Sequence, residues 1–269
     1  MELPTPEEVE GSTDVIYNFI PGGRRVIGLD NLVVKHGTNI DLDEAKSTSF
    51  VARNTTIPVP NILGTYTHNS KNYIVMTRVQ GVPLSECLHS LSATEYDTIA
   101  AEMKVYIDQL RGLRIEEFAE SSYIGSVGRR ECKDKIFRAG SDKRGPFVTE
   151  AEMHSNICDR WVDLRSWGNT KADYYIHILR RMYAENSNHA ILFTHADLSP
   201  GNIMVDKGHV MGILDWQEAG WYPEYWEYVN TLQRCGGMWD TLWPLQIEKI
   251  LQPYDYMRLI ALPIRAQLQ

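Results

Sequence analysis

Three short apolar runs between residues 190 and 216 constrain the fold of this chain more than any other feature. They read AILFTHADL, NIMVD and HVMGILDW, and polar or glycine-containing loops separate them. The turn Asp206-Lys207-Gly208 joins the last two runs, which is typical of a hairpin. The sequence therefore predicts a strand followed by a small hairpin late in the chain.

Oxygen-bearing side chains lie at the ends of these runs. Asp197 lies at the end of the first run, Asn202 begins the second and Asp215 follows the apolar part of the third. Mg²⁺ prefers one or two protein oxygens, with phosphates and waters completing an octahedron. The hairpin brings Asn202 and Asp215 to neighbouring strand ends, so these two are candidate ligands for a magnesium ion. Asp197, at a strand end before a loop, could accept a proton.

The first part of the chain reads as strands with one helix. IPVPNI carries two prolines and must be extended, and the sequence after it reads as strand, polar tip and strand. The expected elements are strands at 15–20 and 31–36 with a glycine-bearing turn region between them, a helix from Asp41, an extended segment at 57–62 and a hairpin over 62–79.

Long helices are expected after Gly81. Ile99, Met103, Ile107 and Leu110 follow helical spacing. A second amphipathic helix spans roughly 172–186, residues 115–170 show no clear period, and the aromatic tail from Pro223 is expected to be helical. The sequence thus predicts an α+β fold with two lobes: a strand-rich lobe at 1–80, a linker at about 77–82 and a helix-rich lobe at 81–269.

The pattern HxDLxxxN, followed by a hairpin and an aspartate, resembles the catalytic loop and the metal-binding aspartate of kinases. The form found here, HADLSPGNIMV…GILDW, resembles the aminoglycoside phosphotransferase and choline kinase family, which has a protein-kinase-like fold. The resemblance covers almost the whole chain. It implies that Asp197 orients and deprotonates an acceptor hydroxyl, that Asn202 and Asp215 hold Mg²⁺ on the phosphates of ATP, and that His195 holds the loop by hydrogen bonds.

The resemblance also implies a role for two charged residues of the first lobe. Lys35 ends the strand NLVVK and matches the lysine that contacts the α- and β-phosphates, and Glu44 on the next helix matches its ion-pair partner. A solvated surface position is the usual fate of both residue types.

The remaining nucleotide contacts are less well marked. The kinase glycine pattern is missing, and only Gly22 and Gly23 could let backbone N–H groups approach phosphate; they could equally form a plain turn. The backbones of Thr77 and Val79 match the segment that bonds the adenine edge, and Gly81 would let the lobes rock.

A small-molecule acceptor fits the chain better than a protein. Ala196 replaces the arginine with which protein kinases read a phosphorylated activation loop, and the long stretch before His195 matches the helices that wall a small-molecule pocket in the resembled family. Glu218 is a candidate substrate contact. Acids and aromatics of the tail suit an amine, or else the aromatics pack into the core; they are Glu224, Glu227, Trp221, Tyr222, Tyr225, Trp226 and Tyr228.

Composition excludes several other classes. Lys+Arg number 27 against 35 Asp+Glu, which gives a formal net charge of −8 and no basic footprint for nucleic acid. The four cysteines have no zinc-ligand spacing. The acidic N-terminus is no secretory signal, and no window approaches the roughly 20 apolar residues of a membrane span. We therefore expect a cytoplasmic protein without membrane or nucleic-acid partners.

The leading hypothesis is an ATP- and Mg²⁺-dependent kinase that phosphorylates a hydroxyl of a small molecule, with an amine-bearing molecule as one candidate acceptor. Two alternatives stay open: a non-catalytic, pseudokinase-type binding module on the same fold, and a protein kinase. The sequence identifies neither the acceptor nor an oligomeric state.

Overall fold

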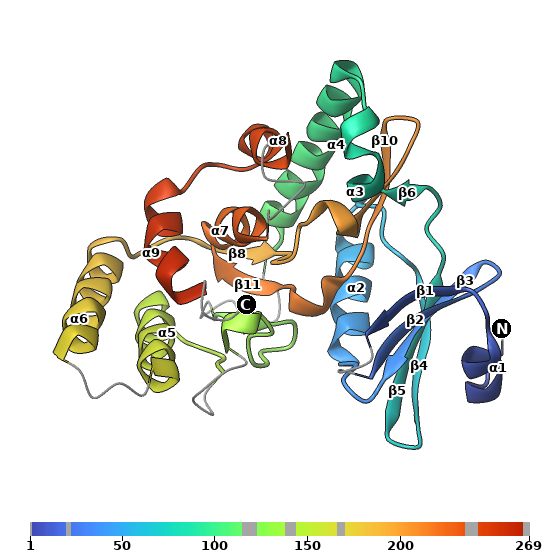
Figure 1. The fold of residues 1–269 in the computed structure, drawn as a ribbon, viewed down its shortest axis with the longest axis horizontal. Coiled ribbons are helices and arrows are strands. Elements are labelled where there is room, and N and C mark those ends of the chain that lie inside the picture. The colour runs from blue at the N-terminus through green and yellow to red at the C-terminus, as the bar shows by residue number, and fades with distance from the viewer. Residues whose placement is uncertain are drawn as a thin grey trace.

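A computed structural model describes residues 2–19, 23–114, 123–137, 144–165, 170–234 and 242–265 (Figure 1). The helices are α1 (Pro6–Gly11), α2 (Asp43–Asn54), α3 (Leu84–Cys87), α4 (Ala93–Gly112), α5 (Glu150–Arg165), α6 (Thr170–Glu185), α7 (Trp226–Gln233), α8 (Leu242–Ile250) and α9 (Asp255–Arg265). The strands are β1 (Val15–Phe19), β2 (Arg24–Leu29), β3 (Leu32–Gly37), β4 (Ile62–His68), β5 (Lys71–Thr77), β6 (Val82–Pro83), β7 (Gly125–Ser126), β8 (Ile191–Thr194), β9 (Ile203–Asp206), β10 (His209–Ile213) and β11 (Gly220–Pro223).

An antiparallel sheet in the order β1-β2-β3-β5-β4 forms the N-terminal part of the molecule. The strands predicted on both sides of the glycine-bearing region and in the 62–79 hairpin are present. The expectation of a turn region between the first two was wrong for residues 24–29, which form β2. Gly28 and two arginines hid this strand, but pairing with β1 on one side and β3 on the other satisfies its backbone.

Helices α1 and α2 lie on opposite faces of this sheet (Figure 1). Val9 of α1 packs in one cluster with Ile27 and Val34, whereas Ala45 of α2 packs with Ile74 on the other face. Successive residues of a strand point to opposite faces. Lys35, which follows Val34, therefore points to the α2 side.

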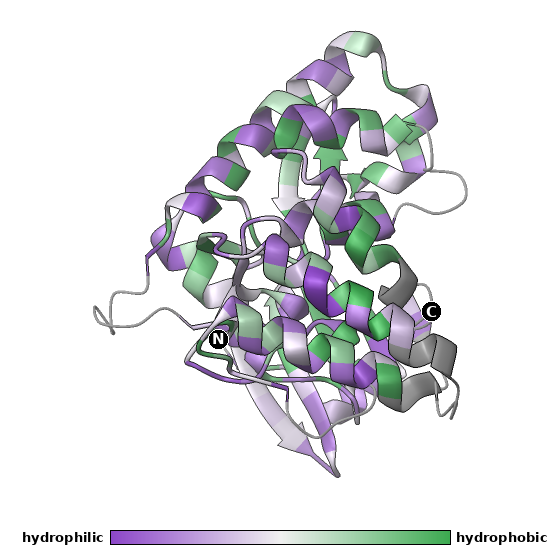
Figure 2. Cartoon of the chain, turned by 90° about the vertical axis from the view of Figure 1, so that its left-hand side faces the viewer, coloured by the Kyte–Doolittle hydropathy of each residue, from purple (hydrophilic) through white to green (hydrophobic). Residues whose placement is uncertain are grey.

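Helix α4 begins the helical part with a capping box, in which Ser92 and Glu95 each accept a hydrogen bond from the other's backbone N–H. Its predicted apolar stripe is buried in the largest core, together with Phe193 of β8 and Ile213 of β10. Figure 2 shows hydrophobic and hydrophilic residues alternating along the helices, as expected for helices with one buried face.

Two small sheets carry the strands predicted late in the chain. Strands β9 and β10 pair as the expected hairpin, and β6 joins β9. Strand β11 lies between β7 and β8. The tail was therefore predicted wrongly at Pro223, which ends β11 opposite Ile191; the next helix begins only at Trp226. Helix α5 lies in the stretch for which no period was found.

An N-terminal antiparallel sheet followed by a helical region makes an α+β fold, as predicted. None of the helices in the described ranges is both long and apolar enough to span a membrane.

Candidate active site

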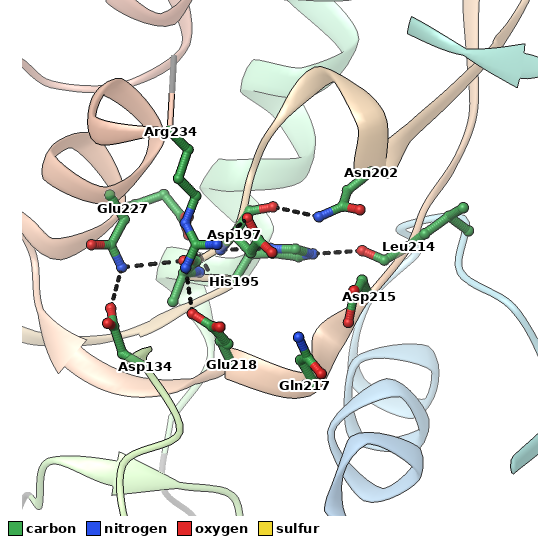
Figure 3. Close-up of polar contacts among 12 residues, drawn as sticks. Asp134, His195, Asp197, Asn202, Leu214, Asp215, Gln217, Glu218, Glu227 and Arg234 are labelled. Atoms are coloured by element: carbon green, nitrogen blue, oxygen red, sulfur yellow. Dashed lines mark hydrogen bonds and ion pairs between the residues drawn. The ribbon is translucent and has the colours of Figure 1, made fainter. Parts of the chain in front are cut away.

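The loop between β8 and β9 brings the predicted site residues together (Figure 3). Asn202 Nδ2 donates to the carbonyl oxygen of Asp197 at 2.8 Å. The backbone N–H of Leu214 donates to the carbonyl oxygen of Asn202, also at 2.8 Å. Ile203 and Ile213 pair across the hairpin, so Leu214 lies opposite Asn202. Asp215 is therefore one residue beyond the position opposite Asn202.

Lys35 joins this hairpin to the five-stranded sheet. Its Nζ lies 2.7 Å from Glu44 Oε2 and 2.9 Å from Asp215 Oδ1, and its side chain is 7% exposed. Burial lowers the pKa of Lys35, but the carboxylates of Glu44 and Asp215 outweigh it, and the net pKa is raised. Lys35 is therefore a fixed ammonium on β3, held by one carboxylate from α2 and one from the loop after β10.

Asp215 and Asn202 could hold a magnesium ion. Burial raises the pKa of Asp215, but the ammonium of Lys35 outweighs it and keeps the carboxyl ionised. The amide N–H of Asn202 donates to the carbonyl oxygen of Asp197, so the amide oxygen of Asn202 is turned away from that residue. No group of three or more His, Cys, Asp or Glu side chains suited to a metal occurs in the described part of the chain. One anionic and one neutral oxygen nevertheless fit Mg²⁺, which takes its other ligands from phosphates and water.

Asp197 lies against a residue that the sequence did not reveal. Arg234 Nη1 is 2.7 Å from Asp197 Oδ1, and its Nη2 donates to Glu218 Oε2. Burial raises the pKa of Asp197 to about 6, although the Arg234 guanidinium lowers it. A lone arginine at the end of α7 has no sequence pattern that marks it, because only the fold brings it to Asp197.

Glu218 does not fit the predicted substrate contact. Its side chain is fully buried (0% exposed), and its carboxylate pairs with Arg234. A buried carboxylate that already holds a guanidinium has no free face for a ligand. The structure therefore places Glu218 behind Arg234 rather than in contact with an acceptor.

His195 holds the loop, as the resemblance implied. The Asp197 backbone N–H donates to His195 Nδ1 at 3.1 Å, so Nε2 carries the proton and donates to the carbonyl oxygen of Leu214 at 2.9 Å. Burial lowers the pKa of His195, which keeps the ring neutral. The ring thus links the Asp197 loop to the strand end before Asp215.

Helix α7 fixes the backbone of the same loop. Glu227 accepts the N–H groups of His195 at 2.6 Å and Ala196 at 3.0 Å. Asn230 donates to the carbonyl oxygen of Ala196, at 3.1 Å, and to Asp134. Ala196 needs such support because its φ is +66°, in the left-handed region that costs a non-glycine residue energy.

The tail aromatics take the second of the two predicted arrangements and pack in the core. Glu227 is equally buried and holds the loop. Each of the aromatic side chains is at most 5% exposed, and they are Trp221, Tyr222, Tyr225, Trp226 and Tyr228. They therefore do not form the aromatic surface that a cationic amine would need.

The glycine loop is described only in part. Gly22 lies outside the described residues, whereas Gly23, with φ +60°, directly precedes β2. From that strand Arg24 donates to Gln217 Oε1 at 2.7 Å, beside Asp215. The start of β2 and the loop after β10 are thus connected by a direct contact.

The segment after β5 has limited donor capacity. The N–H of Thr77 already donates to Asn61 at 2.9 Å, and that of Arg78 to Asn31 at 2.8 Å. Thr77 could therefore meet an adenine only through its carbonyl oxygen, and Val79 comes next with its N–H. Gly81 has φ +100°, and a Cβ there would lie 2.4 Å from the Val205 carbonyl oxygen. Close packing against β9 therefore requires glycine at this position, whereas a role of Gly81 in lobe motion stays a prediction.

Comparisons with known proteins agree with this geometry. Residues 42–259 match the model of the phosphotransferase enzyme family. The aminoglycoside 3'-phosphotransferase of Acinetobacter baumannii is 20% identical over 192 residues, which are 71% of this chain and 65% of that protein.

Solved structures of low sequence identity share the fold. The crystal structure of aminoglycoside phosphotransferase APH(4)-Ia has a TM-score of 0.61 at 17% identity and covers 97% of this chain and 84% of its own. A thermostable mutant of the same enzyme in ternary complex with ADP and hygromycin B has a TM-score of 0.61 at 16% identity, with 97% and 82% covered. The gentamicin complex of APH(2")-IIa has a TM-score of 0.60 at 13% identity, with 100% and 85% covered.

Proposed function

The chain belongs to the phosphotransferase enzyme family, and from that membership we propose that it transfers the γ-phosphoryl group of ATP to a hydroxyl of a small molecule. One observation carries the proposal. Lys35 from the sheet and Asp215 from the hairpin meet at 2.9 Å, one loop away from Asp197. Phosphoryl transfer needs mainly alignment and neutralisation of charge, and this arrangement offers both.

The nucleotide lies between the sheet lobe at 1–80 and the helical lobe at 81–269 in this proposal. Lys35 contacts the α- and β-phosphates, and Glu44 holds Lys35 in position. The carbonyl oxygen of Thr77 and the backbone of Val79 bond the adenine edge. Gly23 lies at the start of β2, at the end of the hairpin that would cover the phosphates. Related structures were solved with ADP, which supports a nucleotide in this fold.

Asp197 accepts the proton in the proposed transfer step. The acceptor oxygen forms a bond to the γ-phosphorus as the bond to the β-phosphate oxygen breaks, and ADP leaves. The acceptor proton passes to the Asp197 carboxylate, whose pKa of about 6 leaves it mostly ionised near neutral pH. A magnesium ion held by Asn202 and Asp215 would neutralise phosphate charge.

The proposed acceptor is defined by its hydroxyl group alone. The proposal of an amine-bearing acceptor began from the acids and aromatics after Asp215, and all of those side chains except the partly exposed Glu224 are buried. Related proteins were solved with hygromycin B or gentamicin, so these two compounds belong in any panel of acceptors.

The test is a panel of acceptors with ATP and Mg²⁺. Aminoglycosides, choline-like amines, sugars and hydroxylated secondary metabolites are each incubated with the protein, and phosphorylated product is detected by mass spectrometry. We expect one class to be phosphorylated by the wild type and not by Asp197→Asn. Product formed equally by both proteins would contradict the assignment of the base.

The same samples separate the alternatives. A binding module would bind nucleotide and form no product with any acceptor. A protein kinase would transfer labelled phosphate to generic protein substrates, which we expect to stay unlabelled. The buried cluster around Asp197 favours the enzyme, because a module has no need of a carboxylate with a raised pKa.

A further inference from the structure

Arg234 lies between two carboxylates at the end of α7 (Figure 3). Its Nη1 is 2.7 Å from Asp197 Oδ1, and its Nη2 donates to Glu218 Oε2. The three side chains are 17%, 13% and 0% exposed for Arg234, Asp197 and Glu218. This cluster is therefore largely removed from solvent, where the orientation of each group matters most.

Charge explains why the three residues occur together. A buried guanidinium beside Asp197 alone would cancel the charge of the proposed base and weaken its pull on a proton. Glu218 supplies a second carboxylate, so the three side chains together keep one negative charge. Each buried ion also gains a partner, without which its burial would be costly.

Shape explains why the cation is arginine. The guanidinium is a rigid planar fork that can hold two oxygens at once, whereas a lysine ammonium is a single flexible point charge. With Oδ1 of Asp197 held by Arg234, the orientation of the carboxylate is set and Oδ2 is the oxygen that remains for an acceptor hydroxyl.

The backbone of the loop is held by other residues. Glu227 bonds the N–H groups of His195 and Ala196, and Asn202 bonds the carbonyl oxygen of Asp197. Arg234 contacts the carboxylate itself. Loss of Arg234 should therefore change the orientation of one side chain and leave the loop in place.

We infer that Arg234 is a positioning residue that fixes the Asp197 carboxylate for proton transfer, with Glu218 as its buried counter-charge. This inference rests on the proposed phosphotransferase function. It assigns Arg234 no contact with the substrate and gives Glu218 a role different from the predicted substrate contact.

The test compares Arg234→Ala and Arg234→Lys with the wild type. Turnover is measured with the acceptor found in the panel and, independently of it, as ATP hydrolysis with water as acceptor. We expect kcat to fall about 10²-fold in Arg234→Ala, as for a small misplacement of a reacting group, while KM for ATP stays within about threefold. Arg234→Lys should recover only part of kcat.

Chemical rescue distinguishes positioning from a general structural role. Millimolar guanidinium should raise kcat of Arg234→Ala several-fold, because the space beside Glu218 is then open to it. The same salt should not restore Asp197→Asn. Arg180→Ala is the matched control, since Arg180 pairs with Asp159 on the exposed faces of α5 and α6, and its kcat should equal that of the wild type.

Two further variants keep the test decisive. If Arg234→Ala does not fold, Arg234→Met combined with Glu218→Gln removes one positive and one negative charge together, so the cluster keeps its single negative charge on Asp197. We expect it to melt near the wild-type temperature and to lack turnover. A kcat within about threefold of the wild type in Arg234→Ala or in the double variant would overturn the inference. Equal rescue of Asp197→Asn by guanidinium would overturn it too.

Failure of the proposed function would look different. In that case the wild type itself neither hydrolyses ATP nor phosphorylates any acceptor. Crystal structures of the wild type and Arg234→Ala would then decide the inference: it requires the Asp197 carboxylate to turn or lose order in the variant, and an unchanged carboxylate would overturn it.

Discussion

At the scale of single residues, Asp197 and Asp215 show how two side chains of the same type can be suited to different roles. Both carboxyl groups are largely buried, and burial alone raises the pKa of each. Lys35 contacts Asp215 directly and reverses the effect, whereas Arg234 only reduces it at Asp197, where the pKa is raised to about 6. One carboxylate is thus suited to hold a cation and the other to exchange a proton.

The raised pKa of Asp197 predicts an acidic limit to activity. A base must be ionised to accept a proton, so kcat/KM for the acceptor should fall about tenfold per pH unit below pH 6 and level off above it. A pH–rate profile measures this. Nucleotide binding, followed over the same range, should persist further into acid because the pKa of Asp215 is lowered. A profile that is flat down to pH 4 would contradict the assignment.

Residue patterns predicted some site residues and not others. Asp197, Asn202 and Asp215 share one short stretch of sequence, and Lys35 and Glu44 lie on adjacent elements, so their proximity could be expected; their roles stay proposals. Arg234 and Glu227 contact the same loop from a helix whose boundaries were predicted wrongly. Such contacts depend on how α7 packs, and sequence spacing alone does not contain that information.

At the scale of secondary-structure elements, α2 is anchored at its first turn. Arg130 Nη1 lies 2.6 Å from both carboxylate oxygens of Asp43, and Lys133 Nζ lies 2.7 Å from Asp41 Oδ2. Both cations belong to the segment that also carries Asp134, which bonds Asn230 of α7. One segment therefore links the helix that carries Glu44 to the helix that holds the Asp197 loop.

Asp43→Asn tests this anchor. Burial raises the pKa of Asp43, but the hydrogen bonds from Arg130 and Lys46 and the charge of Lys133 together outweigh it and lower the pKa to about 2. Its contribution to stability is thus present above pH 4 and lost as the pH falls through about 2. We expect the variant to lose about 1–2 kcal/mol at neutral pH, measured by denaturant unfolding.

A matched control exists for Asp43→Asn. Asp97 pairs with Lys249 across an exposed surface, so Asp97→Asn should cost less than about 0.5 kcal/mol. Equal losses in the two variants would show that the contacts of α2 are ordinary surface pairs.

The connection between β5 and β6 contains Gly81, whose replacement should lower the stability of the protein. Gly81→Ala places a Cβ 2.4 Å from the Val205 carbonyl oxygen at a φ of +100°, which should cost about 1–3 kcal/mol. Gly112→Ala, where nothing lies within 4 Å of the new Cβ, should be neutral or slightly stabilising. Thermal unfolding of both variants measures the difference, and similar Tm values for the two would refute the packing argument.

Elements with a strong period were the ones that sequence could predict. The stripe of α4 and the alternating strands of the 62–79 hairpin follow simple spacing rules. Strand β2 and helix α5 do not, because arginines and glycine interrupt the first and scattered polar residues the second. Strand β11 becomes a strand by pairing with β8, which no local pattern predicts.

At the scale of the whole molecule, polar contacts join the sheet lobe to the helical region, in addition to the apolar packing of Val51 and Ile57 in the main core. Lys35 bonds Asp215, Arg24 bonds Gln217, and Arg130 bonds Asp43. Each of these pairs joins the sheet lobe to a loop of the helical region. A bound nucleotide with its cation would add contacts to both sides and should therefore stabilise the whole chain.

The most direct test of the central claim is nucleotide-induced thermal stabilisation in the wild type, Asp197→Asn and Asp215→Ala. A non-hydrolysable ATP analogue at a hundredfold excess over its Kd should stabilise the wild type by about 2.7 kcal/mol, which is roughly 5–10 °C in Tm. With Mg²⁺ the wild type and Asp197→Asn should shift alike, and Asp215→Ala should lose the Mg²⁺-dependent part. An equal, Mg²⁺-dependent shift in Asp215→Ala, or no shift in the wild type, would contradict the account.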